Sequence, residues 1–347
     1  MFMIKKIGIL TSGGDAPGLN PVIAGFTRKA TELGYEVLGF LDGWRGLIEK
    51  EFEVLTLERV KEIVQEGGTI LGSSRTNPWK IEDGFEKIHD SLKKLDIHAF
   101  AACGGDDTLG VAKELTQQGA KVIGVPKTID NDLEATDQTF GFDTSINIAM
   151  EAIDRLRTTA KSHHRVFVLE LMGRHTGWIA LEAGLAGNAN AIIIPEFEYS
   201  IDELCELLKK RHKQPRNYSI VVVAEGVIFP EMKEKIEQAG VDAFGNLILA
   251  NLKVGEFLAE EIKKRTKLPV RSITLGHIQR GGPPSAYDRV LGLRYGARAA
   301  ELIHKGKFGR MVSLQGNNIT DVPIEKAVAK RKSVPEDLWL LAKSFFG

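Results

Sequence analysis

Short apolar runs that alternate with helical patterns constrain the fold of this chain more than any other feature. Buried strands are predicted at Ile7–Thr11, Glu36–Phe40, His98–Cys103, Lys121–Pro126, Val166–Leu171, Ala191–Ile194 and Ser219–Ala224. Helices are predicted at Pro21–Leu33, Leu109–Gln117, Ser145–Ala160 and Ile201–His212. Such alternation is typical of α/β proteins, in which helices cover parallel sheets. Because a second series begins near Phe142, we expect two three-layer α/β/α domains with mainly parallel sheets and a cleft between them.

Charge and composition exclude several classes of function. The 347 residues hold 46 Lys plus Arg and 46 Asp plus Glu, so no basic field favours a nucleic-acid partner. No run of about 18 apolar residues predicts a membrane span, and the first apolar run is too short for a signal sequence. The two cysteines, Cys103 and Cys205, form neither a disulfide framework nor a metal-ligand spacing. These features favour a cytoplasmic protein that binds neither nucleic acid nor membrane.

Three polar loops follow predicted strands, and the first of them, residues 11–18, reads Thr-Ser-Gly-Gly-Asp-Ala-Pro-Gly. Gly13 and Gly14 expose backbone N–H groups before a predicted helix, where the helix dipole favours an anion. The loop is neither a Walker loop nor a dinucleotide-binding fingerprint, because it lacks the Gly-Lys-Ser/Thr and Gly-x-Gly-x-x-Gly patterns. It is interpreted as an anion site, and a plain strand-to-helix turn is the alternative.

The second loop, residues 104–108, carries two adjacent carboxylates. Asp106 is suited to hold Mg²⁺ beside a phosphate, because hard cations take carboxylate oxygens as ligands. The alternative is that Asp106 and Asp107 only cap the N-terminus of a helix. In open parallel sheets ligands lie beyond the carboxyl ends of the strands, which is where all three loops are expected.

The third loop, residues 126–132, places Lys127, Thr128, Asp130 and Asp132 after a buried strand. Phosphoryl transfer needs an aligned acceptor hydroxyl, a carboxylate that takes its proton, and cations on the transferred oxygens. Asp130 is the candidate base, Thr128 a hydrogen-bond donor and Lys127 a point charge. A solvated turn is the alternative, but the loop stands in line with two other polar loops, so we predict a phosphotransferase.

Arginine and histidine side chains flank several later strands. The arginine fork binds phosphate oxygens in a bidentate manner, so each arginine is a candidate phosphate ligand. For any single one of these residues, a surface salt bridge is the alternative. The candidates are Arg165, Arg174, Arg271, His277 and Arg280.

Six segments, taken together, make the sequence similar to a known family. They are Gly13–Gly18, Gly67–Thr69 with Leu71–Arg75, Gly104–Asp106, Thr128–Asp132, Met172–Arg174 and Gly276–Gly282. With these segments in order, the chain resembles the phosphofructokinases along almost its whole length. The resemblance implies a glycolytic or gluconeogenic transferase that phosphorylates the 1-hydroxyl of fructose 6-phosphate. It also implies an active site in the cleft between the two domains and Mg²⁺ as the cofactor.

The resemblance implies a role for each candidate residue. Asp130 is implied as the base, Asp106 as the Mg²⁺ ligand, and Arg174 as the residue that stabilises charge on the transferred group. The implied contacts of the phosphoryl donor are Gly13, Gly14, Arg75, Gly105, Asp107 and Thr108. The implied contacts of the sugar are Thr128, Asp130, Asp132, Met172, Gly173, Arg174 and Glu225, and those of its 6-phosphate are Arg165, Arg271, His277 and Arg280.

Domain limits and assembly also follow from the resemblance. A donor-binding domain is expected at residues 1–141 plus about 255–307, and a fructose 6-phosphate-binding domain at 142–254 plus about 308–322. A helical segment is expected at 323–347. In the family, Arg165 and Arg271 reach in from a neighbouring subunit, which implies a homodimer or homotetramer with shared active sites.

Two residues bear on the phosphoryl donor. The ATP-using bacterial pattern has Gly at both positions where this chain has Asp107 and Lys127, and this pair is similar to the pyrophosphate-dependent branch. Asp107 is expected to place a carboxylate where the α-phosphate of ATP lies, whereas pyrophosphate ends before that point. Lys127 is expected to neutralise charge in the transition state. We therefore predict pyrophosphate as the donor, in a reversible reaction, with an ATP-dependent or dual-donor enzyme as the alternative.

Single residues bear on effector control and on the class of protein. Arg28 and Arg157 match the nucleotide-effector pattern of allosteric bacterial members, but Ala24 replaces an Arg and Asn190 a metal-binding Glu, so little nucleotide control is expected. Sedoheptulose 7-phosphate stays open as a second acceptor. NAD or lipid kinases share the Gly-Gly-Asp loop but not the later segments. A non-catalytic sensor would be expected to lose the base or the metal carboxylate, and this chain keeps both.

Overall fold

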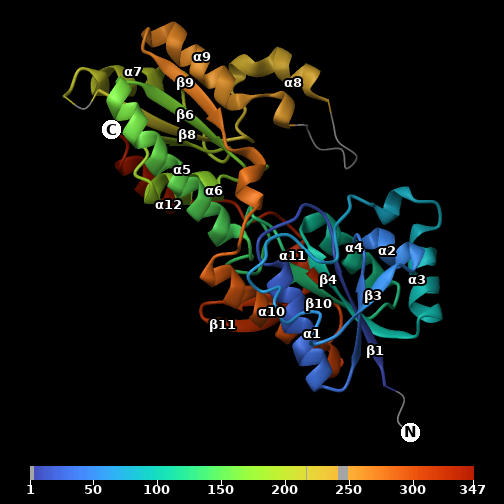
Figure 1. The fold of residues 1–347 in the computed structure, drawn as a ribbon. Coiled ribbons are helices and arrows are strands. Elements are labelled where there is room, and N and C mark those ends of the chain that lie inside the picture. Colours follow the sequence, from blue (N-terminus) through green and yellow to red (C-terminus); the bar gives the residue numbers. More distant parts are fainter. Residues whose placement is uncertain (1–3, 216, 241–248) are drawn as a thin grey trace. The chain divides into compact units, whose positions relative to one another are not determined.

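The computed structural model describes residues 4–215, 217–240 and 249–347. The chain forms two compact units, each a mostly parallel sheet with helices packed on it (Figure 1). Unit 1 comprises Met1–Thr144 and Arg280–Arg331, and unit 2 comprises Ser145–Gln279 and Lys332–Gly347. The predicted α/β class is confirmed, and the chain passes between the units at three places.

The sheet of unit 1 has the strand order β11-β10-β5-β4-β1-β2-β3. Its inner pairs, from β10 through β5, β4 and β1 to β2, are parallel, and the two edge strands β3 and β11 are antiparallel to their neighbours. The strands are β1 (Lys6–Thr11), β2 (Glu36–Phe40), β3 (Phe52–Leu55), β4 (Ile97–Gly104), β5 (Val122–Pro126), β10 (Arg310–Gln315) and β11 (Asn318–Pro323).

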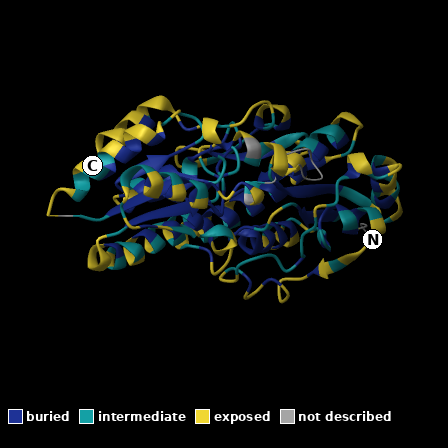
Figure 2. Ribbon diagram, turned by 90° about the horizontal axis from the view of Figure 1, so that it is seen from above, coloured by how far each residue is buried: buried dark blue, intermediate teal, exposed yellow. Residues whose placement is uncertain are grey.

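Helices on unit 1 bury alternate side chains of the strands in two apolar clusters. On β1, Ile7 and Ile9 join one cluster and Leu10 the other, as the period of two in a strand requires. In Figure 2 the strands are accordingly buried, while many helix residues are exposed. The helices are α1 (Leu19–Glu32), α2 (Trp44–Glu49), α3 (Gly84–Lys94), α4 (Asp106–Gln117), α10 (Ala286–His304), α11 (Ile324–Ala327) and the short 3-10 helix η1 (Pro78–Lys80).

Glycine lets two helices of unit 1 lie unusually close together. Helix α10 packs along α1, and a Cβ on Gly296 would lie 2.1 Å from the carbonyl oxygen of Val22. A Cβ on Gly25 would lie 2.3 Å from the carbonyl oxygen of Leu293. This contact fixes α10, whose N-terminal end follows the Gly276–Gly282 segment.

Unit 2 contains a four-stranded parallel sheet in the order β7-β8-β6-β9. Its strands are β6 (Val166–Leu171), β7 (Ala191–Ile193), β8 (Ser219–Ala224) and β9 (Val270–Thr274). Its helices are α5 (Phe142–His163), α6 (Trp178–Ala186), α7 (Ile201–His212), α8 (Lys233–Ala239), α9 (Val254–Thr266) and α12 (Glu336–Ser344), with the 3-10 helices η2 (Pro230–Met232), η3 (Leu249–Asn251) and η4 (Gly276–Arg280). Helix α5 begins just before the change of unit, and η4 ends just after it.

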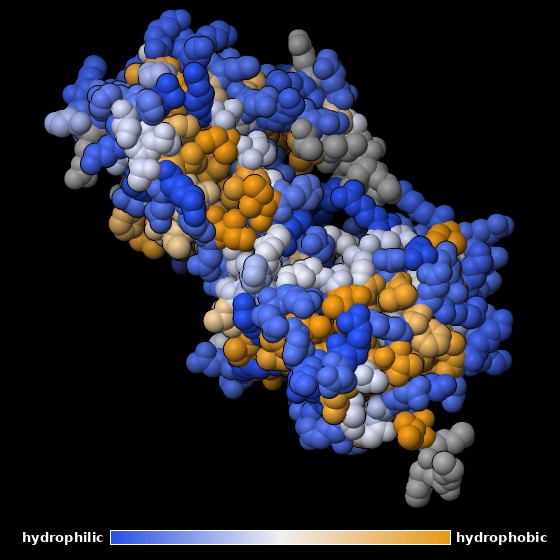
Figure 3. Space-filling view, viewed as in Figure 1, coloured by the Kyte–Doolittle hydropathy of each residue, from blue (hydrophilic) through white to orange (hydrophobic). Residues whose placement is uncertain are grey.

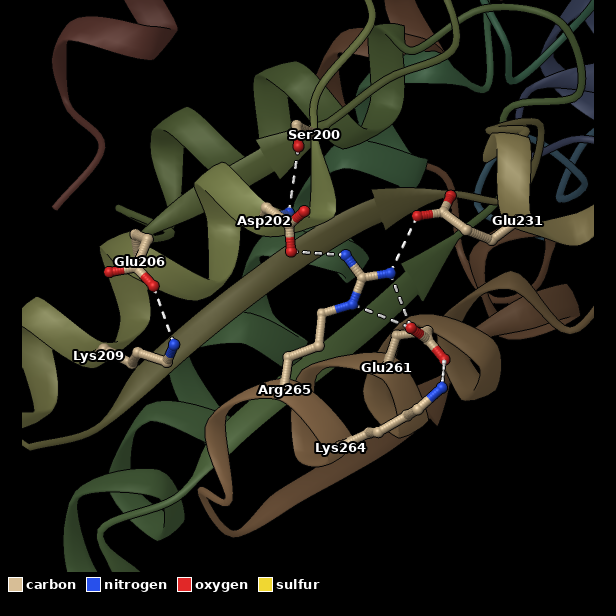
Figure 4. A network of polar contacts seen from close by, with 8 residues as sticks. All are labelled: Ser200, Asp202, Glu206, Lys209, Glu231, Glu261, Lys264 and Arg265. Carbon is tan, nitrogen blue, oxygen red and sulfur yellow. Dashed lines mark hydrogen bonds and ion pairs between the residues drawn. The ribbon is translucent and has the colours of Figure 1, made fainter.

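One arginine connects three helical segments of unit 2 (Figure 4). Arg265, near the end of α9, donates to Asp202 at 2.8 Å, to Glu231 at 3.0 Å and to Glu261 at 2.8 Å. Asp202 lies in the first turn of α7 and Glu231 in η2. A cation in the last turn of one helix and an acid in the first turn of another both suit the helix dipoles. The network therefore holds α7 and η2 against α9.

Two segments lie in a different unit from the one predicted for them. Residues 255–279 were expected in the donor domain, but β9 pairs with β6 and belongs to unit 2. Residues 308–322 were expected with the sugar domain, but β10 pairs with β5 in unit 1. The segment 323–347 is divided, with α11 in unit 1 and α12 in unit 2. These limits were implied by the resemblance, and only the pairing of the strands shows which sheet each segment joins.

The surface gives little further evidence of where a ligand or partner binds. Among the described residues, no helix is long and apolar enough to cross a membrane. The face drawn in Figure 3 is largely hydrophilic, with apolar patches between charged side chains. Scattered apolar side chains are ordinary on protein surfaces and do not by themselves identify a binding site.

Candidate active site

The three polar loops meet at one edge of the sheet of unit 1, as predicted. Strands β1, β4 and β5 are neighbours, with Thr11 beside Cys103 and Gly104 beside Pro126. Their carboxyl ends therefore lie at the same edge. The backbone N–H of Lys127 donates to the carbonyl oxygen of Gly104 at 3.0 Å, which joins the third loop to the second.

The first loop is held by the segment that precedes η1. The N–H of Gly13 donates to the carbonyl oxygen of Ser74 at 3.2 Å, and Ser73 Oγ donates to the carbonyl oxygen of Gly13 at 2.5 Å. Gly13 has a φ of 82°, a conformation that favours glycine. These bonds bring Arg75, which is exposed, next to the loop, where the resemblance implies a contact with the phosphoryl donor.

Two cationic side chains flank the glycine pair. Lys127 is buried, and its Nζ lies 3.5 Å from where a Cβ on Gly13 would be. Arg280 Nη1 donates to the carbonyl oxygen of Asp15 at 3.0 Å and lies 2.9 Å from where a Cβ on Gly14 would be. A side chain at Gly14 would therefore displace Arg280. The two glycines keep this edge of the sheet open between two positive charges.

The electrostatics of this region centre on Lys127. Burial, and then the positive charge of Arg280, lower the pKa of Lys127 to about 8, while Asp130, Asp106 and Asp132 act in the opposite direction. Burial, and then Asp130 and Asp106, raise the pKa of Asp132. The region thus gathers several carboxylates around one buried ammonium group.

Hydrogen bonds within the third loop fix the backbone at Asp130. The N–H of Asp130 donates to Thr128 Oγ1 at 3.0 Å, and Thr139 Oγ1 donates to the carbonyl oxygen of Thr128 at 2.7 Å. Asn131 has a φ of 52°, which asparagine tolerates, and its Oδ1 accepts from the N–H of Thr139 at 3.1 Å. Asp130 is therefore set in a preorganised turn rather than in a loose loop.

The second loop starts α4. Gly105 precedes the helix, and Asp106 and Asp107 lie exposed in its first turn, with the N–H of Asp107 donating to Asp106 Oδ1 at 2.9 Å. Thr108 is buried, and a Cβ on Gly104 would lie 2.2 Å from the Cβ of Thr108. Only glycine at 104 allows the strand to turn into the helix at this distance.

The carboxylate of Asp106 can supply one ligand to a divalent cation whose other ligands are phosphate oxygens and water. In the described part of the chain, no three His, Cys, Asp or Glu side chains form a metal-binding group. Mg²⁺ in phosphoryl-transfer sites takes one or two carboxylates, substrate phosphates and water. One exposed carboxylate beside an anion loop suits that arrangement.

One residue near Asp106 was not identified from the sequence. Arg331 Nη2 lies 3.8 Å from Asp106 Oδ2, and Arg331 also lowers the pKa of Asp132 as the smallest of the named causes. Arg331 lies far along the chain from the second loop and is part of no motif. Arg331 is brought near Asp106 by the fold, in which Arg331 pairs with Leu133 in a short antiparallel bridge.

In unit 2, the residues predicted to hold the sugar follow neighbouring strands. Met172, Gly173 and Arg174 follow β6, and Glu225 follows β8, with its N–H donating to the carbonyl oxygen of Leu171 at 2.8 Å. A Cβ on Gly226 would lie 2.3 Å from the carbonyl oxygen of Arg174, so the two loops are in close contact. His277 lies exposed in η4, which follows β9. These residues share one edge of the sheet.

Two predicted 6-phosphate ligands lie at the opposite edge of that sheet. Arg165 precedes β6, and Arg271 pairs with Phe167 near the start of the same strand. A six-residue strand spans about 20 Å, and Met172 follows its other end. One chain therefore does not bring Arg165 and Arg271 together with Met172. Arg280 belongs to unit 1, and its assignment to the 6-phosphate stays a prediction.

The chain is similar in sequence to several known proteins. The family model for phosphofructokinase matches residues 6–303. The chain is 52% identical to the pyrophosphate–fructose 6-phosphate 1-phosphotransferase of Amycolatopsis methanolica, over 99% of this chain and 100% of that one. It is 45% identical to the ATP-dependent 6-phosphofructokinase of Corynebacterium efficiens, over 99% of each chain.

The fold is similar to that of solved structures. The crystal structure of a pyrophosphate-dependent phosphofructokinase from Marinobacter aquaeolei matches with a TM-score of 0.82, covering 96% of this chain and 86% of that one at 24% identity. The family match spans most of the chain and includes all three loops of unit 1. The chain belongs to the phosphofructokinase family.

Proposed function

We propose that this protein transfers a phosphoryl group from pyrophosphate to the 1-hydroxyl of fructose 6-phosphate, giving fructose 1,6-bisphosphate and phosphate in a reversible reaction. The observation that carries the proposal is the buried Lys127 beside Gly13, together with Asp107 in the first turn of α4. The relatives support it, because those named for pyrophosphate reach 52% identity and those named for ATP reach 45%.

The residues of unit 1 account for the chemistry of the proposal. Asp130 takes the proton of the 1-hydroxyl, the hydroxyl oxygen forms a bond to the near phosphorus of pyrophosphate, and phosphate leaves. Lys127 neutralises charge on the transferred group, where a preorganised cation stabilises the transition state most. Arg174 in unit 2 is proposed to stabilise the same charge. Mg²⁺ held by Asp106 and by donor oxygens would supply further neutralisation.

The remaining residues bind either the phosphoryl donor or the sugar. Unit 1 binds the donor through Gly13, Gly14, Arg75, Gly105, Asp107 and Thr108. The sugar is held by Thr128, Asp130 and Asp132 of unit 1 and by Met172, Gly173, Arg174, Glu225 and His277 of unit 2.

A second copy of the chain completes the phosphate site. Along β6, Arg165 lies roughly 23 Å from Met172, and Arg271, which pairs with Phe167, lies roughly 16 Å from it. Both distances are too long for an arginine side chain to reach the same sugar phosphate. We assign the two arginines to the site of a neighbouring subunit in a homodimer or homotetramer. An active enzyme that sediments as a monomer would contradict this assignment.

Nucleotide control is not part of the proposal. Asn190 is buried, its Oδ1 accepts from the N–H of Ile220 at 2.9 Å, and its own N–H donates to the carbonyl oxygen of Ile220 at 2.8 Å. This amide bridges β7 and β8 and replaces an effector-site carboxylate. We propose a cytoplasmic enzyme with hyperbolic kinetics, and sigmoidal kinetics that ADP relieves would contradict it.

Initial rates with each donor test the proposal. With fructose 6-phosphate as the acceptor and equal Mg²⁺, we expect kcat/KM for pyrophosphate to exceed that for ATP by about a hundredfold or more. Fructose 6-phosphate should also form from fructose 1,6-bisphosphate and phosphate, and sedoheptulose 7-phosphate can be compared as the acceptor in the same assay. Efficient turnover with ATP and none with pyrophosphate would establish the ATP-dependent alternative.

The titration of Lys127 predicts an alkaline limb in the pH profile. The cationic form is required, and its pKa in the free protein is about 8, so kcat/KM for pyrophosphate should fall as pH rises through that value. Bound pyrophosphate favours the ammonium form, which should move the limb of kcat to higher pH. In a Lys127→Arg variant the limb should disappear, because a guanidinium does not titrate in this range. An unchanged limb in that variant would assign the titration to another group.

A further inference from the structure

Gln279 is a fully buried polar residue that no role assigned so far explains. It lies in η4 and is the last residue before the chain leaves unit 2. Its Oε1 accepts from the N–H of Met172 at 2.8 Å, and its Nε2 lies 3.3 Å from Ser145 Oγ. A backbone N–H only donates, so the amide oxygen must face Met172.

Met172 begins the loop that is assigned to the sugar. It is the first residue after β6, and Gly173 follows with a φ of 133°, so the backbone leaves the line of the strand here. An N–H that no longer pairs within a sheet needs a new acceptor, and Gln279 supplies it in a part-buried contact. The start of the Met172–Arg174 loop thus depends on one side chain from η4.

The residues next to Gln279 and Ser145 in the sequence are held by hydrogen bonds within unit 1. Arg280 follows Gln279 and donates to the carbonyl oxygen of Asp15 at 3.0 Å, in the donor loop. Thr144 precedes Ser145, and both its N–H and its Oγ1 donate to the buried Asp288, at 2.8 and 2.6 Å. Consecutive residues therefore hold a loop of unit 2 and a loop of unit 1.

We propose that Gln279 is a positioning residue that sets the sugar loop through the N–H of Met172. Gln279 and Arg280 are consecutive in the chain, so one short segment contacts both the Met172–Arg174 loop of unit 2 and the first loop of unit 1. The identity of the acceptor rests on the proposed function, whereas the positioning of Met172 does not. Ser145 is a secondary partner, which provides a matched control.

The test compares Gln279→Met with Ser145→Ala. Methionine has a similar length and flexibility but is only a weak acceptor, so the core stays filled while the N–H of Met172 loses its partner. We expect KM for fructose 6-phosphate to rise about tenfold, because the N–H of Met172 loses its acceptor in a part-buried position. KM for pyrophosphate should change less than about twofold. Ser145→Ala removes the 3.3 Å partner of Gln279 Nε2 and should lower stability, but KM for fructose 6-phosphate should change less than about twofold because the N–H of Met172 keeps its acceptor.

A second measurement needs no activity. Hydrogen exchange of the free protein should be faster by about tenfold in the peptide that contains Met172 for Gln279→Met, and unchanged for Ser145→Ala. If wild type does not act on fructose 6-phosphate, the proposed function fails while this measurement still decides the role of Gln279. Gln279→Leu gives the same comparison if the methionine variant does not fold. Unchanged exchange and KM in the Gln279 variant, or equal effects of both substitutions, would overturn the proposal.

Discussion

Replacing Asp130 with asparagine should lower kcat about a thousandfold, because asparagine cannot take the proton of the sugar hydroxyl. The N–H of residue 130 still donates to Thr128 Oγ1, so the turn should be kept. KM for fructose 6-phosphate should stay within about threefold, because an amide of the same size loses a proton acceptor and little binding. Steady-state kinetics in both directions measure these values.

Asp132 provides the matched control for Asp130. It lies in the same loop and is buried, and its pKa is raised above the value of the unfolded chain. Ionisation of Asp132 therefore lowers the stability of the folded chain as pH rises from the pKa of the unfolded state through the raised pKa of the folded state. At alkaline pH, Asp132→Asn should unfold at the same temperature as wild type or at a higher one. We expect this variant to raise KM for fructose 6-phosphate more than it lowers kcat. If Asp132→Asn lowered kcat as much as Asp130→Asn, the assignment of the base would be wrong.

Strand patterns predicted the three loops of unit 1 well, because each loop directly follows a buried strand. Glu36–Phe40 and Val166–Leu171 have the predicted bounds, and β1 differs from its prediction by one residue. Helix α4 starts at Asp106, three residues before the predicted start. The two acidic residues stabilise the first turn through the helix dipole, so they belong to the helix as well as to the site.

Features that depend on pairing between distant segments could not be predicted in this way. The resemblance implied that residues 255–279 belong to the donor domain, and only the pairing of β9 with β6 shows that they belong to unit 2. Arg331 and Gln279 carry ordinary polar side chains, and only the fold shows that they lie beside Asp106 and Met172. Arg280 was predicted to be a phosphate ligand, but its contact with Asp15 required the folded chain.

Replacing both Asp107 and Lys127 with glycine should change the preferred donor from pyrophosphate to ATP. Loss of Lys127 removes the buried cation at the transferred group, which should lower kcat with pyrophosphate by about a hundredfold. Loss of Asp107 removes a negative charge expected near the α-phosphate, which should raise kcat/KM for ATP on the order of a hundredfold. Initial rates with both donors, at fixed Mg²⁺ and fructose 6-phosphate, measure the change.

Three single substitutions at Asp107 separate charge from size as the barrier to ATP. Asp107 is exposed in the first turn of α4, so water screens part of its field, and the effect should weaken in high salt. Asp107→Asn keeps the shape and removes the charge, Asp107→Glu keeps the charge, and Asp107→Gly removes both. If repulsion excludes ATP, asparagine should give most of the gain seen with glycine, and glutamate should give none. A gain with glycine alone would show that the side chain excludes ATP by its volume, and the electrostatic explanation of donor choice would then be wrong.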